Sequence, residues 1–322
     1  LAVPNNGTHN TPGEQIAFSP DDSWRFPAGM VFIKHFDLPI NDTNSALVKR
    51  LETRFLVMDG EGGAYGLTYK WRDDESDADL LTTSATQDYE IVNGDGTIRT
   101  QTWYFPSRSD CMSCHTANAG YVLGVRTHQL NCPTTYPATG ITDNQLRALG
   151  HIGLLGTNYS EVQLPNYLKA YSLTNAAATL EERVRSYLDS NCSQCHRPNG
   201  VNAYFDARYT TPLADQGIIR GPTILFLNST NDRVVVPQDL ASSLLHNRAN
   251  RVGQFQMPPL AKNVVDSNAV ELIAAWINSL PIGPTATLSG PANVNGAFSV
   301  IVQFSAAVTG LTAGDFQVEN GS

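Results

Sequence analysis

The sequence predicts an α+β, multidomain chain in which an antiparallel β region comes first, a helical region follows and a short β tail comes last. Three observations predict this order. Residues 14–105 place β-forming side chains between clusters of turn residues, and residues 179–280 carry apolar residues at helical spacing behind capping residues. Residues 285–322 contain no Lys, Arg or His and alternate Val, Ile and Phe with small polar residues.

The N-terminal part is expected to be an antiparallel β domain over residues 1–105. Its strand candidates are Met30–Phe36, Leu51–Val57, Ala64–Trp71 and Ile98–Phe105. Clusters of Gly and Asp between them are typical of hairpin turns. The chain starts at Leu1 without an initiator Met or a signal peptide, so we expect a mature or trimmed product.

The helical part divides into two segments. Residues 106–178 are rich in loop-forming residues and carry one capped helix pattern that begins at Asp143. Residues 179–280 are expected to form a domain of their own, which starts at a Thr179 cap followed by acidic residues. Its further helices are expected over Asp239–Arg248 and Asp266–Leu280, the last one stopped by Pro281.

Composition limits the function. A hydrophobic content of 41% with only 16% charged residues indicates a globular chain rather than a disordered one. The net charge of −9 disfavours nucleic acid and anionic membrane surfaces as partners and favours a partner with a basic docking surface. No apolar run approaches the length that crosses a bilayer, so we expect no transmembrane segment.

The cysteines carry the strongest signal. Four of the five form two C-x-x-C pairs, each followed directly by His: Cys111, Cys114 and His115, then Cys192, Cys195 and His196. Two thiols at this spacing add to the vinyl groups of a haem, and the next His ligates its iron. The sequence therefore predicts two covalently attached haem c groups, with His115 and His196 as the iron ligands.

Two other interpretations of the four thiols are weaker. A structural zinc site does not require His directly after both pairs, and the pairs lie far apart in the sequence. A thioredoxin-like pair follows a strand, whereas Cys192 follows a helical pattern. Cys132 has no partner in the chain and is expected to be a free, partly buried thiol, with an intermolecular link as the alternative.

Residues 179–280 resemble a class I cytochrome c. The resemblance rests on Tyr187–His196, on the sequence Gln-Met-Pro-Pro-Leu at 256–260 and on Ala275–Leu280. It implies an all-α domain with His196 as proximal ligand and Met257 as distal thioether ligand. His246 on the preceding helix is the competing ligand.

A second resemblance covers residues 1–280. The segments 24–29, 51–57, 103–111 and 122–124 resemble a family of bacterial di-haem proteins often attached to quinoprotein sugar dehydrogenase-like modules. In that family the segment before Leu1 would continue the sheet, so the resemblance implies that the domain over residues 1–105 is N-terminally incomplete. Residues 285–322, with Val308–Phe316, resemble a bacterial immunoglobulin-like repeat of cell-surface proteins. They are too few for a complete sandwich of roughly 100 residues, so this segment is either a truncated domain or is completed by another chain.

The sixth ligand of the first haem is open at this stage. His151 leads because it lies on an amphipathic helix downstream of the motif, and His128, His35 and Met30 are the alternatives. An unfilled position is a further possibility. Arg108 and Arg126 are candidates to pair with haem propionates.

We expect an electron carrier rather than an enzyme. Covalent haem attachment takes place outside the cytoplasm, so the location is periplasm, cell surface or extracellular space. The alternatives are a peroxidase-like di-haem enzyme with an open iron, and a polymeric surface protein that conducts electrons and assembles through its C-terminal β tail.

Overall fold

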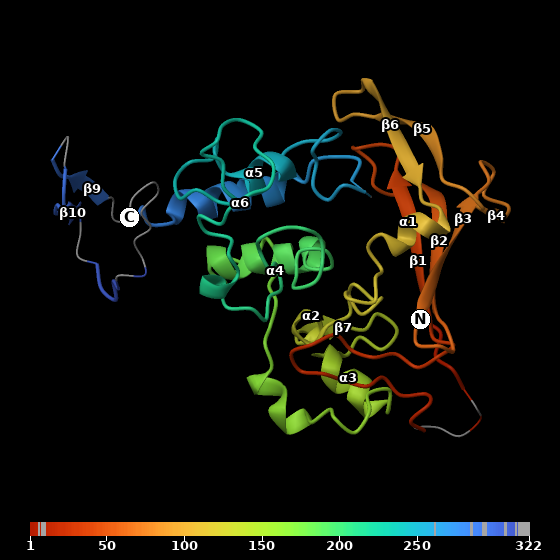
Figure 1. The fold of residues 1–322 in the computed structure, drawn as a ribbon. Coiled ribbons are helices and arrows are strands. Elements are labelled where there is room, and N and C mark those ends of the chain that lie inside the picture. The colour runs from red at the N-terminus through yellow and green to blue at the C-terminus, as the bar shows by residue number, and fades with distance from the viewer. Residues whose placement is uncertain are drawn as a thin grey trace. The chain divides into compact units, whose positions relative to one another are not determined.

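The computed structural model describes residues 1–322 except 6, 8–10, 261, 284–285, 292–294, 306–307, 313 and 315–322. It divides into two compact units, Leu1–Asn278 and Ser279–Ser322. Each unit is described by itself. Figure 1 shows the path of the chain and the labels of its elements.

The first unit begins with an antiparallel sheet in the order β1-β2-β3-β4. Its strands are β1 (Val31–Pro39), β2 (Val48–Met58), β3 (Ala64–Trp71) and β4 (Ala78–Leu80). The hairpin of β5 (Ala85–Val92) and β6 (Ile98–Phe105) follows. Four of these strands, β1, β2, β3 and β6, lie within or close to the predicted ranges, because alternating β-branched and aromatic residues suit a half-buried pleated surface. The strands β4 and β5 were not among those predicted. A short pair, β7 (Pro133–Thr135) with β8 (Thr142–Asn144), comes later.

The helices of this unit are short. They are α1 (Arg108–Met112), α2 (Thr127–Leu130), α3 (Gln145–His151), α4 (Leu180–Cys192), α5 (Leu244–Ala249) and α6 (Ser267–Ser279), with 3₁₀ turns at Glu161–Asn166 and Leu213–Asp215. Figure 1 shows α1 beside the sheet, and α5 and α6 above α4.

One core cluster joins the sheet to the following segment. It includes the buried side chains of Trp24, Met30, Leu56, Val122 and Leu146. Because Leu56 is on β2 and Val122 lies just after the first Cys-His motif, this cluster fixes the motif segment against one face of the sheet.

The prediction of an all-α class I cytochrome c-like domain over residues 179–280 was wrong. Only 19% of the chain is helical, and strands predominate over the few short helices. Between α4 and α5 the chain runs through turns and isolated bridges, such as Ile219 with Val235. This segment is rich in Gly, Pro, Asn and Asp, which favour turns over helices. The capped amphipathic patterns predicted α4 and α6, but not the irregular chain between them.

The second unit contains the antiparallel pair β9 (Ala286–Ser289) and β10 (Ile301–Phe304) among its described residues. Both lie in the segment 285–322 that was expected to be β. Part of the immunoglobulin-like resemblance, at Ala313, Asp315 and Phe316, lies outside the described residues.

In the part of the chain that the structure describes, none of the helices has the length and apolar character needed to cross a bilayer.

Candidate functional site

The first Cys-His motif is presented by α1, whose start is fixed locally. Ser107 and Asp110 form a capping box, and the Tyr104 hydroxyl donates a 2.7 Å hydrogen bond to Asp110 Oδ2. Cys111 lies directly against β3: a Cβ added to Gly66 would come within 2.7 Å of the Cys111 Cβ and Sγ atoms. The absence of a side chain at Gly66 is therefore what lets this motif approach the sheet so closely.

His115 is held in the form that a metal ligand needs. Its Nδ1 lies 2.5 Å from the carbonyl oxygen of Tyr121, so Nδ1 carries the proton and donates. Burial lowers the pKa of His115, which keeps the ring neutral. Nε2 is thereby left as a lone-pair donor, the arrangement common in ligating histidines.

The second motif follows α4 without a break. Thr179 and Glu182 form the capping box that starts this helix, and Cys192 is its last residue. Burial raises the pKa of the Cys192 thiol to about 12. The signal for this helix was present in the sequence, because the Thr cap and acidic first turn precede apolar residues at helical spacing.

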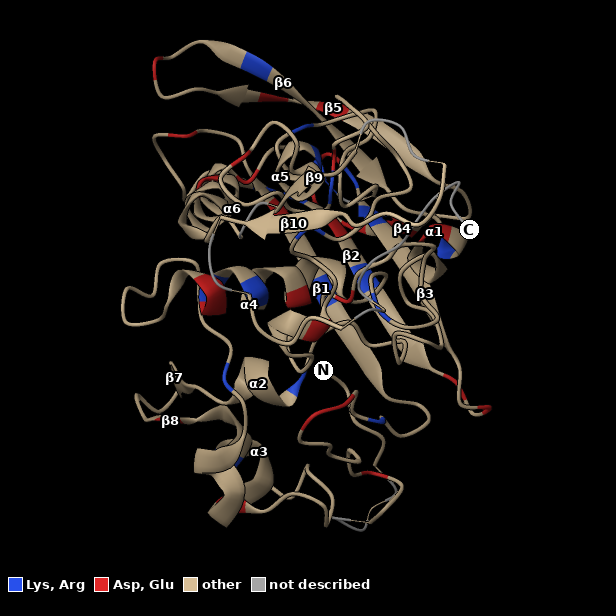
Figure 2. Ribbon diagram, turned by 60° about the vertical axis from the view of Figure 1, so that its left-hand side comes forward, with Lys and Arg blue, Asp and Glu red and all other residues tan. Residues whose placement is uncertain are grey.

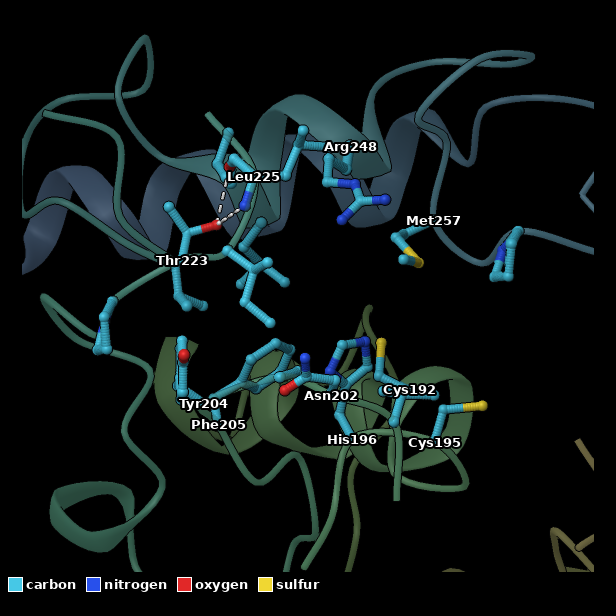
Figure 3. A pocket seen from close by; sticks show the side chains of 18 residues that line it. Cys192, Cys195, His196, Asn202, Tyr204, Phe205, Thr223, Leu225, Arg248 and Met257 are labelled. Atoms are coloured by element: carbon cyan, nitrogen blue, oxygen red, sulfur yellow. Dashed lines mark hydrogen bonds between the residues drawn. The ribbon is translucent and has the colours of Figure 1, made fainter. Parts of the chain in front are cut away.

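Cys192, His196 and Met257 line one pocket (Figure 3). Figure 3 shows Met257 across the pocket from His196, with the sulfur of Cys192 turned into the space between them. Aliphatic side chains from the 222–225 turn and from α5 supply much of the remaining wall. His246, the competing ligand, does not line this pocket. The structure thus brings together four of the predicted site residues, since Cys195 also lies in the pocket wall.

His196 has a buried ring nitrogen that no group of the protein satisfies. Its Nδ1 makes no hydrogen bond, and its ring stacks on Phe205 at 4.1 Å between centroids. Burial, with the nearby positive charge of Arg248, lowers its pKa to about 4. His196 thus lacks the acceptor that orients His115, and what fits it to ligate an iron is its neutral imidazole in an apolar pocket that also holds a thioether.

The two motifs meet. The thiols of Cys114 and Cys195 lie close enough to act on each other: their interaction raises the pKa of Cys114 and lowers the pKa of Cys195 to about 7. Two further bonds join the segments after each motif: Asn118 Nδ2 donates to Pro198 O at 3.1 Å, and Arg197 Nη1 donates to Asn118 O at 2.8 Å. In Figure 3 the sulfur of Cys195 points away from the pocket.

A buried pair ties the two motif segments together a second time. His128 on α2 hydrogen-bonds through Nε2 to Asp189 Oδ2 on α4, at 2.7 Å. The backbone N–H of Tyr209 donates to the other carboxylate oxygen, and the Tyr209 ring stacks on His128. His128 therefore has a structural partner and is not directed to His115. No sequence signal pointed to this pair, because its members lie on separate helices.

The other candidates for the sixth ligand of the first haem are also placed elsewhere. His151 is exposed at the end of α3, and α3 lies apart from α1 in Figures 1 and 2. Met30 is fully buried in the core cluster. His35 on β1 hydrogen-bonds to Thr53 Oγ1 at 2.7 Å.

The two arginines proposed for propionates differ in setting. Arg126 is buried, and its Nε and Nη2 have no hydrogen-bond partner. Arg108 stacks on the Tyr65 ring at 4.6 Å. Sequence reasoning missed Arg248, which lines the pocket of the second motif and is held by a bond from its Nε to Phe255 O. Cys132 is partly buried and forms no disulfide with another described cysteine.

The described residues fit haem attachment better than a bare metal ion. Among them, no group of three or more His, Cys, Asp or Glu side chains is arranged to hold a metal ion. A haem iron takes most of its ligands from the porphyrin and only one or two from the protein. Each motif offers that donor set: two thiols and one neutral imidazole.

Comparison with known proteins adds no assignment, because no family model, no curated protein and no solved structure matches this chain.

Proposed function

We propose that this chain is a di-haem c-type cytochrome that transfers electrons outside the cytoplasm. The observation that carries the proposal is that the segments directly after the two motifs are hydrogen-bonded to each other, through Asn118 with Pro198 and Arg197. A group attached at one motif and a group attached at the other would be bound through neighbouring segments. Such a contact suits an electron relay, which needs its two redox groups close together.

The ligand chemistry supports the same function. His115 and His196 are both kept neutral by burial, so each imidazole can ligate without first losing a proton. Met257 lies opposite His196 across an apolar pocket, and a His/Met ligand pair raises the potential of a haem iron. The second haem is therefore the higher-potential member of the relay. Bound at these residues, haem supplies the one-electron chemistry.

Location and partner follow from the same chemistry. Haem is attached covalently outside the cytoplasm, which places the working protein in the periplasm, on the cell surface or in the medium. The net charge of −9 favours a redox partner with a basic docking surface. The rate of electron exchange with such a partner should therefore fall as ionic strength rises.

The first test counts the haems. The chain is exported in cells that carry a haem-attachment apparatus, and its intact mass and alkaline pyridine spectrum are recorded after denaturation. Two thioether-linked haems per chain are expected. A denatured chain that retains no haem, or only one, contradicts the proposal.

The second test addresses Met257. The Met257→Leu variant preserves the side-chain volume but removes the sulfur, so it should lower the potential of one haem and abolish any thioether-to-iron absorption band. Met112→Leu is the matched control, because Met112 does not line the pocket. An unchanged potential in the Met257 variant would exclude this residue as a ligand.

A further inference from the structure

The face of the sheet that packs on the first motif carries an unusual set of polar groups. In an antiparallel sheet, directly paired residues project from the same face. The register of the sheet pairs Phe32 with Leu56, and Leu56 with Gly66. Two residues further along β1, it pairs Lys34 with Arg54, and Arg54 with Thr68. We call this side the inner face, defined by Phe32, Lys34, Glu52, Arg54, Leu56, Gly66 and Thr68.

The inner face adjoins the first motif. Leu56 and Phe32 belong to the core cluster that also contains Tyr121, whose carbonyl accepts the His115 hydrogen bond. Gly66 is in direct contact with Cys111. Figure 2 shows basic residues in blue along β1 and β2.

Arg54 is held rigidly. Its Nε donates to Glu52 Oε2 at 2.9 Å and its Nη2 donates to Glu52 Oε1 at 2.5 Å, while the guanidinium stacks on the Phe36 ring at 4.2 Å. Glu52 is completely buried and also accepts a bond from Trp103 Nε1. The bidentate pair occupies two of the three guanidinium nitrogens and fixes the direction of Nη1.

A second polar group on this face has no partner. Thr68 is 2% exposed, and its Oγ1 makes no hydrogen bond. Buried hydroxyls are rarely left without a partner. Thr68 lies in the same row as Lys34 and Arg54 and on the same face as Gly66, which touches Cys111. An unsatisfied hydroxyl at this position points to a ligand that accepts or donates a hydrogen bond there.

No described His or Met supplies a sixth ligand on this side. His35 alternates with Lys34 on β1 and therefore projects from the opposite face, where it bonds to Thr53. His128 is paired with Asp189, and Met30 and Met58 are core residues. Lys34 is exposed, so solvent can reach this side of the motif.

We propose that the first haem binds a small inorganic ligand opposite His115, and that Arg54, Lys34 and Thr68 on the inner face are the groups that contact it. The ligand class is a molecule of two or three heavy atoms that coordinates haem iron and accepts hydrogen bonds, such as peroxide, nitrite or nitric oxide. This inference rests on the proposed function, because it requires haem on Cys111 and Cys114. It adds a substrate-binding site to a protein proposed as a carrier.

The wild-type holoprotein gives the decisive measurement. Electron paramagnetic resonance of the ferric protein should show one high-spin and one low-spin iron. Cyanide should convert the high-spin iron alone, with one equivalent bound per chain. Two low-spin irons that ignore cyanide would overturn the proposal, since both sixth positions would then be filled by the protein.

Variants of the inner face test the polar contacts. Lys34→Gln should weaken cyanide binding by about tenfold, the loss of one charge-assisted hydrogen bond, and should change carbon monoxide binding to the ferrous iron much less. His35→Gln is the matched control on the opposite face and should bind both ligands as the wild type does. Equal cyanide affinities in the Lys34 and His35 variants would contradict the assigned role of Lys34.

Arg54 needs a paired variant. Arg54→Gln alone leaves Glu52 buried without its partner, so the double change Glu52→Gln with Arg54→Gln, which keeps a neutral polar pair, is measured beside it. Both should bind cyanide more weakly than the wild type.

If Lys34→Gln instead converts a low-spin iron to high spin, Lys34 is itself the sixth ligand and the open site is excluded.

The outcomes separate the two proposals. Fewer than two covalent haems removes the proposed function. Two haems with both irons low-spin and inert to cyanide leave the electron-transfer function intact and remove only the ligand site.

Discussion

The two Cys-His motifs have the same sequence pattern but different surroundings. The first lies against a sheet, with its histidine tied to the Tyr121 carbonyl and with charged and polar residues of the inner face beside it. The second follows the capped helix α4 and lines an apolar pocket with Met257 opposite its histidine. The attachment chemistry is local to each pentapeptide, whereas the sixth coordination position depends on what the rest of the fold brings near.

Under the proposed function, this difference would give the two sites different roles. A thioether in an apolar pocket suits an iron that only exchanges electrons, because no solvent or substrate needs to reach it. A charged face with an exposed Lys34 and an unsatisfied Thr68 hydroxyl suits an iron that binds a small inorganic ligand. The contact between Cys114 and Cys195 would let the second site supply or remove the electrons of the first.

Removal of the thiols of one motif should have the largest effect. Changing Cys111 and Cys114 to Ser should leave one haem per chain and abolish cyanide binding. Changing Cys192 and Cys195 to Ser should also leave one haem but preserve cyanide binding. Mass spectrometry and ligand titration check this, with Cys132→Ser as the control that keeps both haems. Cyanide binding by the first variant would show that the roles are reversed.

The buried pair between α2 and α4 should be the next most sensitive. Asp189→Ala leaves the His128 ring buried without its partner and should lower the free energy of unfolding by about 3 kcal/mol. Denaturant unfolding measures this, with exposed Asp215→Ala as a control within about 0.5 kcal/mol of wild type. A loss below 1 kcal/mol, about the net worth of one ordinary hydrogen bond, would mean that the pair does not hold the two segments together.

The same pair predicts a pH dependence. Burial by itself would raise the pKa of Asp189, but the hydrogen bond and charge of His128, the Tyr209 N–H bond and the charge of Arg126 together outweigh it and hold this pKa below its usual value. The ionised carboxylate therefore contributes stability that is complete above the unfolded pKa of about 3.9 and is lost as the pH falls through the folded pKa. In the Asp189→Asn variant, the free energy of unfolding should fall less steeply than in the wild type as the pH drops below about 4. An equally steep fall in the two proteins would argue against this contribution.

A smaller effect is expected from the close approach at β3. Gly66→Ala would place a Cβ within 2.7 Å of Cys111, so the motif or the strand must shift, at a cost of about 1–3 kcal/mol. Gly94→Ala, where an added Cβ meets nothing within 4 Å, is the matched control. Thermal unfolding and the spectrum of the first haem report the shift. Identical behaviour of the two variants would contradict the contact.

The smallest effect should come from the helix cap of the second motif. Thr179→Ala removes the side-chain acceptor for the Glu182 N–H and should cost about 1 kcal/mol. Thr179→Ser retains the hydroxyl and should cost much less. Equal losses in a chemical denaturation series would show that packing, rather than the cap, accounts for the effect.

Local patterns in the sequence predicted much of the fold. The strands that contain Lys34, Arg54 and Thr68 were predicted from the alternation of apolar and polar residues. The helix α4 was predicted from its Thr179 cap. Both signals arise within a few residues of the chain. The turns and isolated bridges between α4 and α5 were missed, since they depend on Gly and Pro conformations that amphipathic periodicity does not report. This is why the all-α expectation failed.

The candidate site could also be predicted only in its local parts. Each pentapeptide motif was visible in the sequence, and Met257 was predicted from the resemblance of residues 179–280 to a class I cytochrome c. The contact of Cys114 with Cys195 and the pairing of His128 with Asp189 join positions far apart in the chain, and only the folded structure brings them together. His151 was the first choice for the sixth ligand because it lies on an amphipathic helix. Amphipathicity does not show whether that helix packs against the first Cys-His motif.

The nearness of the Cys114 and Cys195 thiols also bears on biogenesis under the proposed function. If the chain folded before haem was attached, the two thiols would lie near each other in an oxidising compartment, where a disulfide between them would block both sites. Haem attachment would therefore have to precede the folding of this region. Export without the attachment apparatus, followed by peptide mapping, should recover the Cys114–Cys195 linkage, and its absence would remove this constraint on the order of maturation.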